Sequence, residues 1–194
     1  MLMVNKTTLY YKDNYKDKFR WNFIKFLLIE DKTDFNKVKD ELVNVYLKTY
    51  ENIPDYHYKN IQDIKDYIEW LFYHKSNDLN KNLIIIAVDN NNKKVVGFIA
   101  GDTYYYDREL EDYAIAIHEI SIIPEYQGLK IGSTLMNELL ETAKKYNKDK
   151  SLKAKYSVLY VGEKNYKAIN FYKKLGYTYF SKHGKWIKMI MHLD

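Results

Sequence analysis

The stretch Ile120-Ser-Ile-Ile-Pro-Glu-Tyr-Gln-Gly-Leu-Lys-Ile-Gly-Ser-Thr-Leu-Met136 indicates how the chain is organised. Its apolar, β-branched first part ends at Pro124, a short turn carries Gln127 and Gly128, and helical spacing of apolar residues follows. At the N-terminus of such a helix, unpaired N–H groups point outward and the helix dipole adds a partial positive charge. We therefore expect a phosphorylated group to bind at this turn.

Two common phosphate-binding patterns do not fit the turn. A P-loop has four residues between its first glycine and Gly-Lys-Ser/Thr, whereas three residues separate Gly128 from Gly132 and Ser133 follows directly. The dinucleotide pattern Gly-x-Gly-x-x-Gly is absent as well. The turn instead resembles the pyrophosphate loop of the GNAT superfamily of N-acetyltransferases, Gln/Arg-x-x-Gly-x-Gly/Ala, with Gln127 in first place and Lys130 in place of the middle glycine. Taken alone, an ordinary strand-to-helix turn is the alternative.

A second stretch, Val161-Gly-Glu-Lys-Asn-Tyr-Lys-Ala-Ile-Asn-Phe-Tyr-Lys-Lys-Leu-Gly-Tyr177, resembles the other signature of the superfamily, Asn-x-x-Ala-x-x-x-Tyr-x-x-x-Gly-Phe/Tyr. The matching residues are Asn165, Ala168, Phe171, Tyr172, Gly176 and Tyr177. Asn165 is a suitable helix N-cap and Gly176 a suitable helix stop. An amphipathic core helix would explain the apolar face, but it would not explain why the two motifs follow in this order.

Composition limits the classes of protein that fit. The 194 residues are 46% hydrophobic with a formal net charge of +5, which is typical of one folded domain. The lysines are scattered, so we expect no nucleic-acid partner, and no apolar run is long enough to span a membrane. There is no cysteine, the histidines are dispersed, and His118-Glu119 lacks the second histidine of a zinc-protease motif, so we expect no metal. A cytoplasmic location is expected.

Hydrophobic patterning together with the resemblance predicts an α/β (α+β) GNAT fold. Residues 1–20 would be a polar N-terminal arm and residues 21–194 the domain. Strands are expected at 21–29, 83–88, 95–100, 113–123, 156–161, 177–181 and 186–192, and helices at about 35–45, 60–75, 130–146 and from 166. The resemblance implies a mixed, mostly antiparallel sheet with helices on both faces, and a gap between the strands that end at Ile123 and Val161. Residues 101–112 read as an acidic, aromatic loop, which is either a solvated hairpin tip or a lip that attracts an amine.

The resemblance implies transfer of an acetyl group from acetyl-CoA to a primary amine by direct attack in a ternary complex. The residues implied in cofactor binding are Ile120, Ser121, Ile122, Gln127, Gly128, Leu129, Lys130, Ile131, Gly132, Ser133, Asn165 and Tyr172. The main-chain groups of residues 127–133 would hold the pyrophosphate, and those of residues 120–122 the pantetheine arm. Tyr172 occupies the position of the general acid that protonates the leaving thiolate.

The sequence leaves two candidates for the general base, because superfamily members draw it from several places. His118 lies nine positions before Gln127, where some members have His or Glu, and its neighbour Glu119 is the second candidate. Neighbours on a regular strand face opposite sides, so the sequence predicts that only one of the two can serve.

Other interpretations stay open at this point. A GNAT-like module that binds acyl-CoA without turnover is one alternative, and a basic nucleic-acid binder is another. The acceptor is expected to be a small-molecule, polyamine or peptide amine, and the chain is expected to be a monomer or a homodimer.

Overall fold

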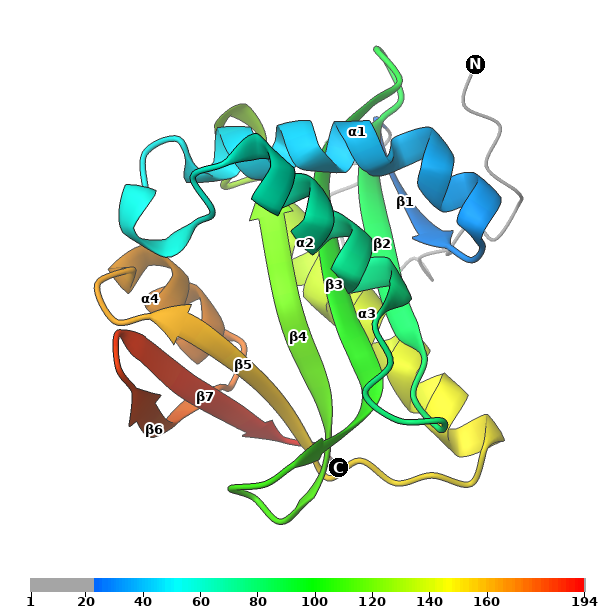
Figure 1. Ribbon diagram of the computed structural model, residues 1–194, viewed down its shortest axis with the longest axis vertical. Coiled ribbons are helices and arrows are strands. Elements are labelled where there is room, and N and C mark those ends of the chain that lie inside the picture. The colour runs from blue at the N-terminus through cyan, green and yellow to red at the C-terminus, as the bar shows by residue number, and fades with distance from the viewer. Residues whose placement is uncertain (1–22, 194) are drawn as a thin grey trace, which may run out of the picture.

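Seven strands of the computed structural model, which describes residues 23–193, form one mixed sheet in the order β1-β2-β3-β4-β5-β7-β6 (Figure 1). The strands are β1 (Ile24–Ile29), β2 (Asn82–Asp89), β3 (Lys94–Asp107), β4 (Asp112–Ile122), β5 (Tyr156–Gly162), β6 (Thr178–His183) and β7 (Trp186–His192). The helices are α1 (Lys32–Tyr50), α2 (Ile61–Tyr73), α3 (Ile131–Asp149) and α4 (Tyr166–Lys174). All neighbouring strands are antiparallel except β4 and β5, so the expected α/β fold is confirmed.

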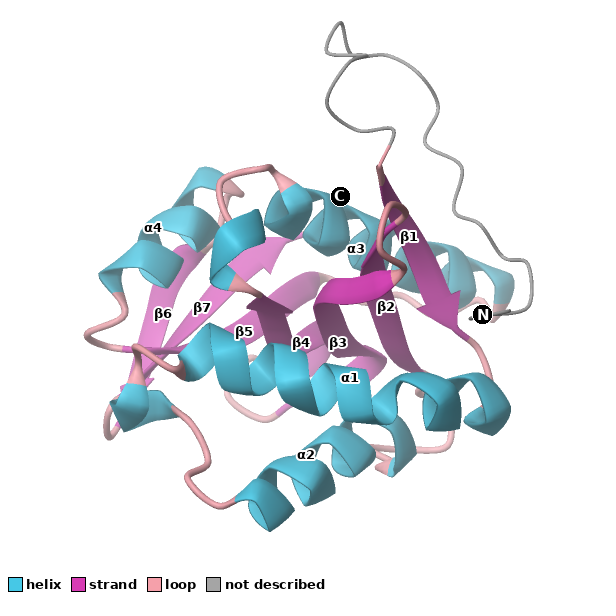
Figure 2. Ribbon diagram, turned by 90° about the horizontal axis from the view of Figure 1, so that it is seen from above, coloured by secondary structure: helices cyan, strands magenta, loops and turns pink. Residues whose placement is uncertain are grey.

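The helices cover both faces of the sheet, with α1 and α2 on one side and α3 and α4 on the other (Figure 2). Strand β2 shows why its sequence is apolar without alternation. Ile84 and Ile86 pack into the core under α1 and α2, whereas Leu83 and Ile85 pack into the core under α3. A strand with helices on both sides buries both of its faces, so every position from Leu83 to Val88 is apolar.

Strand β4 carries one extra residue relative to its partner β3. Ala100 pairs with Glu119 and Gly101 pairs with Ile117, which leaves His118 as the bulged residue. A Cβ atom on Gly101 would lie 2.3 Å from the carbonyl oxygen of Ala116, so only glycine lets the two strands approach this closely.

Strands β4 and β5 pair over four residues only, from Ala114↔Tyr156 to Ile117↔Leu159. Strand β4 continues to Ile122 and stays paired with β3 on its other side. Beyond Ile117, the edge of β4 that faces β5 therefore has no strand partner within residues 23–193. The gap expected between these two strands is present.

The expected loop at residues 101–112 is wrong, because β3 runs on to Asp107 and only residues 108–111 form the turn. Asp102 and Thr103 are fully buried, and Asp107 accepts the N–H groups of Glu109 and Leu110, which closes the hairpin. Polar residues that find partners in the interior produce a strand that looks like a loop in the sequence. The expected arm at residues 1–20 lies outside the described residues, and none of the helices within 23–193 is both long and apolar enough to cross a membrane.

Candidate active site

The turn before α3 presents its backbone amides. Gly128 has a φ of +78° and Lys130 a φ of 61°, and α3 begins at Ile131 without a side-chain cap at its N-terminus. Within the described part of the chain, the N–H groups of Ile131, Gly132 and Ser133 have no hydrogen-bond partner. Three unpaired amides at the start of a 19-residue helix form a site suited to an anion.

Close packing and one side chain fix this turn against its neighbours. A Cβ atom on Gly132 would lie 3.1 Å from Ile122 and 3.2 Å from the ring of Phe171, so a glycine lets α3 pack against β4 and α4. The side-chain amide of Gln127 donates to the carbonyl of Ile122 at 2.9 Å and accepts from Lys167 at 2.5 Å. The Gln127 side chain thus ties the turn to β4 and α4, while the amides of Ile131, Gly132 and Ser133 stay available.

Glu119 is buried beneath the C-terminal end of α1 and the middle of α2. Its carboxylate accepts hydrogen bonds from Ser121 at 2.8 Å, Tyr50 at 3.0 Å and Tyr67 at 3.3 Å. Burial raises the pKa of Glu119 to about 7, against the opposing effect of these three donors. A carboxyl group that titrates near neutral pH can take up or release a proton under ordinary conditions.

Tyr172 lies on α4, on the other side of the gap between β4 and β5. The residue is 8% exposed, and its hydroxyl has no hydrogen-bond partner among residues 23–193. Burial raises the pKa of Tyr172 well above its usual value, and the charge of Glu119 raises it further. The phenol therefore keeps its proton at neutral pH. Asn165 caps the helix by accepting the N–H group of Ala168 at 3.1 Å.

Residues 39–177 match the Acetyltransferase (GNAT) family. This chain belongs to that family. It is similar to an uncharacterized N-acetyltransferase of Archaeoglobus fulgidus, with 34% identity over 69% of this chain and 82% of the relative. The uncharacterized N-acetyltransferase MJ1207 of Methanocaldococcus jannaschii is 30% identical over 86% of this chain and 69% of its own length. The chain is thus a GNAT N-acetyltransferase, and the resemblance stated from the two motifs is confirmed.

Solved structures share this GNAT fold. PH1933 from Pyrococcus horikoshii OT3 aligns with a TM-score of 0.70 and 31% identity, covering 88% of this chain and 99% of PH1933. The PaiA N-acetyltransferase of Thermoplasma acidophilum, crystallised with coenzyme A, aligns with a TM-score of 0.61 and 17% identity over 87% of this chain and 99% of its own. At that identity the second comparison concerns the fold alone.

The bulge in β4 overturns the prediction that His118 and Glu119 face opposite sides of the GNAT sheet. The Nε2 atom of His118 lies 3.2 Å from Asp102, and its ring contacts Trp70 of α2. Glu119 contacts α1 and α2 through Tyr50 and Tyr67. An extra residue turns the strand by one position, so both side chains lie on the α1/α2 face.

The acidic residues within 101–112, for which an amine-attracting lip was one of two interpretations, are mostly paired with cations. Asp107 and Glu109 contact the fully buried ammonium of Lys188 at 2.6 and 2.8 Å. Asp112 pairs with Lys155 at 2.5 Å, and Asp102 faces two histidines. Lysines neutralise Asp107, Glu109 and Asp112 within the fold and Asp102 is buried, so the interpretation as a lip finds no support.

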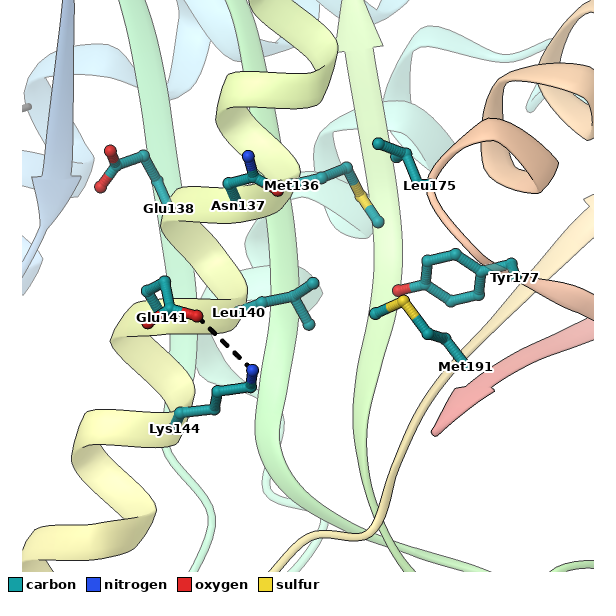
Figure 3. Close-up of a pocket in the computed structure, with 9 residues that line it drawn as sticks. All are labelled: Met136, Asn137, Glu138, Leu140, Glu141, Lys144, Leu175, Tyr177 and Met191. Carbon is teal, nitrogen blue, oxygen red and sulfur yellow. Dashed lines mark ion pairs between the residues drawn. The ribbon is translucent and has the colours of Figure 1, made fainter. Parts of the chain in front are cut away.

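A cavity of about 500 Å³ lies on the other face of the sheet, between α3 and the start of β6 and end of β7. In Figure 3, Leu175, Tyr177 and Met191 lie opposite Met136 and Leu140 of α3, and Lys144 pairs with Glu141. None of the residues predicted for catalysis or cofactor binding lines it.

Sequence reasoning missed several side chains that surround Glu119. Tyr50 carried no signal, because it is the last residue of a helix and lies 69 positions before its partner. Tyr67 on α2 is half-buried and also donates to the carbonyl of His118 at 3.2 Å. The helical stripe places Tyr67 beside Ile64 and Ile68, and only the packing of α2 over the bulge brings its hydroxyl to the site.

Proposed function

We propose that this acetyltransferase binds acetyl-CoA in the gap between β4 and β5 and acetylates a primary amine by direct attack in a ternary complex. The observation that carries the proposal is the unpaired edge of β4, which begins beside Glu119 and leads to the unpaired amides of Ile131, Gly132 and Ser133 at the start of α3. The coenzyme A complex of the PaiA N-acetyltransferase, which shares the fold, supports the choice of cofactor.

Main-chain groups would do most of the cofactor binding. The Gln127 amide predicted for this role donates to the carbonyl of Pro124 at 3.1 Å, so the amides of Ile131, Gly132 and Ser133 would hold the pyrophosphate, and the ammonium of Lys167 beside Gln127 would add positive charge. The backbone of Ile120, Ser121 and Ile122 would pair with the pantetheine amides as a further strand does. An N–H group of this edge would also stabilise the thioester oxygen as negative charge develops on it.

Glu119 is the general base that this geometry supports best. An acceptor ammonium with a pKa near ~10 must lose a proton before its nitrogen attacks. Above a pH of about 7 the Glu119 carboxylate is ionised and can accept that proton, with its position set by three hydroxyl groups. His118, the first candidate from the sequence, is directed at Asp102 instead.

Tyr172 is the proposed general acid. The amine nitrogen forms a bond to the carbonyl carbon, the carbon–sulfur bond breaks, and the phenol gives its proton to the departing thiolate. Burial raises the pKa of Tyr172, and the same surroundings disfavour the charged thiolate, so the two effects oppose each other. The nitrogen gives one proton to Glu119 before attack and a second when the amide forms, which restores the Tyr172 phenol. Glu119 then releases its proton to solvent, so one proton is released overall for each acetyl group transferred.

The test is a screen of amines with acetyl-CoA, in which thiol release is followed together with the mass of the product. A small amine, a polyamine and a peptide would each gain the mass of one acetyl group if they are acceptors. The same assay compares two variants. Tyr172→Phe removes the proposed general acid, and Tyr160→Phe is its matched control, because Tyr160 is 48% exposed on β5. If coenzyme A does not raise the melting temperature of the protein, this result would contradict the proposed site.

A further inference from the structure

Three side chains from three elements converge beside the bulge in β4. They are His74 just after α2, Asp102 in β3 and His118 in β4. One ligand atom from each lies within 4.8 Å of the other two. The chain brings them together from positions that no spacing motif links.

The Asp102 carboxylate is fully buried and lies in an unusual environment. Its two oxygens are 2.9 Å from Nε2 of His74 and 3.2 Å from Nε2 of His118. Even so, none of these four atoms has a partner with hydrogen-bond geometry among the described residues. The ring nitrogens thus lie close to the carboxylate without pointing their N–H bonds at it. A buried carboxylate without hydrogen bonds is costly unless a cation compensates it.

The contact of the other ring nitrogen of His74 indicates which tautomer the ring adopts. Its Nδ1 atom lies 2.7 Å from the carbonyl oxygen of Trp70, which can only accept, so Nδ1 carries a hydrogen. In a neutral ring, Nε2 then carries a lone pair and no hydrogen, so it can bind a metal ion. Histidines that bind metals commonly donate the second ring N–H to a backbone carbonyl in this way.

We infer that His74, Asp102 and His118 form a binding site for a divalent transition metal, with Zn²⁺ as the preferred ion. Tetrahedral Zn²⁺ with N and O ligands at ~2.0–2.1 Å places neighbouring ligand atoms about 3.3 Å apart. The two Asp102 oxygens lie 2.9 and 3.2 Å from the two histidine nitrogens, and one ligand atom from each of the three residues lies within 4.8 Å of the others. Two imidazoles disfavour Mg²⁺ and Ca²⁺, which prefer oxygen ligands. The metal would link the end of α2 to the bulge next to Glu119, under the indole of Trp70, which stacks on His74 at 4.0 Å.

The site is tested on the full chain without a histidine tag, after chelation and dialysis. Titration with Co²⁺ should produce visible d–d absorption that saturates at one equivalent and disappears when Zn²⁺ is added. Zinc at ~100 times its Kd should raise the melting temperature by about 5–10 °C, and Mg²⁺ should not. An ion pair between protonated histidines and Asp102 predicts neither effect, so the absence of both would overturn the inference.

Variants locate the bound ion. Asp102→Asn and His74→Gln should each weaken Co²⁺ binding by more than the ~10–100-fold that changes around a ligand set usually cost. The matched control is His192→Gln, which removes an exposed histidine of β7 and should bind as the parent does. Circular dichroism checks that the variants fold, and the titration of the parent chain decides the question if they do not. Stoichiometric binding that survives both ligand variants would also overturn the inference.

Discussion

The phenol of Tyr50 at the C-terminal end of α1 donates a hydrogen bond of 3.0 Å to Glu119, which lies 69 positions later in β4. This bond joins the helical layer to the strand whose edge is open to a cofactor. A second hydroxyl, from Tyr67 of α2, also lies next to the same carboxylate. The proposed base is therefore positioned by α1, α2 and β4 together, and its protonation is sensitive to all three.

The pH dependence of the reaction should report Glu119. Because its pKa is raised to about 7, kcat/KM should rise with pH through that value as the carboxylate ionises. Glu119→Gln should remove this limb of the profile and lower kcat by ~10²–10⁴-fold. Glu141→Gln, at an exposed position of α3, is the control and should leave the profile unchanged. A limb near pH 7 that persists in Glu119→Gln would assign the base to another group.

Stability should respond to the same carboxyl group with a defined sign. Its pKa is raised on folding, from ~4.3 in an unfolded chain to about 7, so the folded state holds the proton more tightly. The resulting contribution to stability is present below about pH 4.3 and is lost as pH rises through 7. The Tm of Glu119→Gln minus the Tm of the parent should therefore be larger at pH 8 than at pH 5, as measured by calorimetry. A difference independent of pH would contradict the raised pKa.

Replacement of the proposed acid should separate chemistry from binding. Tyr172→Phe keeps the ring and removes a hydroxyl that has no hydrogen-bond partner within residues 23–193. We expect kcat to fall by ~10²-fold or more, with little change in the Kd for coenzyme A or in the melting temperature. Stopped assays of thiol release and calorimetric titration measure the two quantities. Equal losses in turnover and in coenzyme A affinity would indicate a binding role for the hydroxyl.

Replacement of either glycine of the turn by alanine should destabilise the protein, for a different reason at each position. Gly132→Ala puts a Cβ atom 3.2 Å from the ring of Phe171, so we expect a loss of ~1–3 kcal/mol from overpacking and a weaker site for coenzyme A. Gly128→Ala meets no atom within 4 Å, but its φ of +78° costs an alanine ~1–2 kcal/mol. Urea unfolding gives both free energies. In Gly132→Ala, combining the change with Phe171→Leu should recover stability, whereas Gly128→Ala should gain nothing from it.

The buried Lys188 should be required for stability and not for chemistry. Its ammonium contacts Asp107 at 2.6 Å and Glu109 at 2.8 Å. Lys188→Met leaves the buried Asp107 carboxylate without its cation, so we expect the free energy of unfolding to fall by ~3–5 kcal/mol. Adding Asp107→Asn to this variant should recover part of the loss, and urea unfolding at pH 7 measures both. Full stability in Lys188→Met would show that the two N–H groups bound to Asp107 suffice.

The architecture followed from the sequence where local patterns repeat. The turn at Gln127–Ser133, the capping by Asn165 and the order of strands and helices were all predictable, because glycine placement and apolar spacing act over a few residues. The surroundings of Glu119 were not. Tyr50 and Asp102 reach the site only through tertiary packing, and the strand alternation used to separate His118 from Glu119 fails at a bulge. Paired polar residues also made the second half of β3 look like a loop.

The bulge at His118 has a consequence for comparing this strand with its relatives. Upstream of it, odd-numbered side chains such as Ile115 and Ile117 enter the layer beneath α3, and downstream the even-numbered Ile120 and Ile122 do so. The odd-numbered and even-numbered side chains of β4 therefore change faces of the sheet at His118. A relative whose strand lacks the bulge therefore aligns correctly only with a one-residue gap at His118, because an ungapped alignment would assign the residues on one side of this point to the wrong layer.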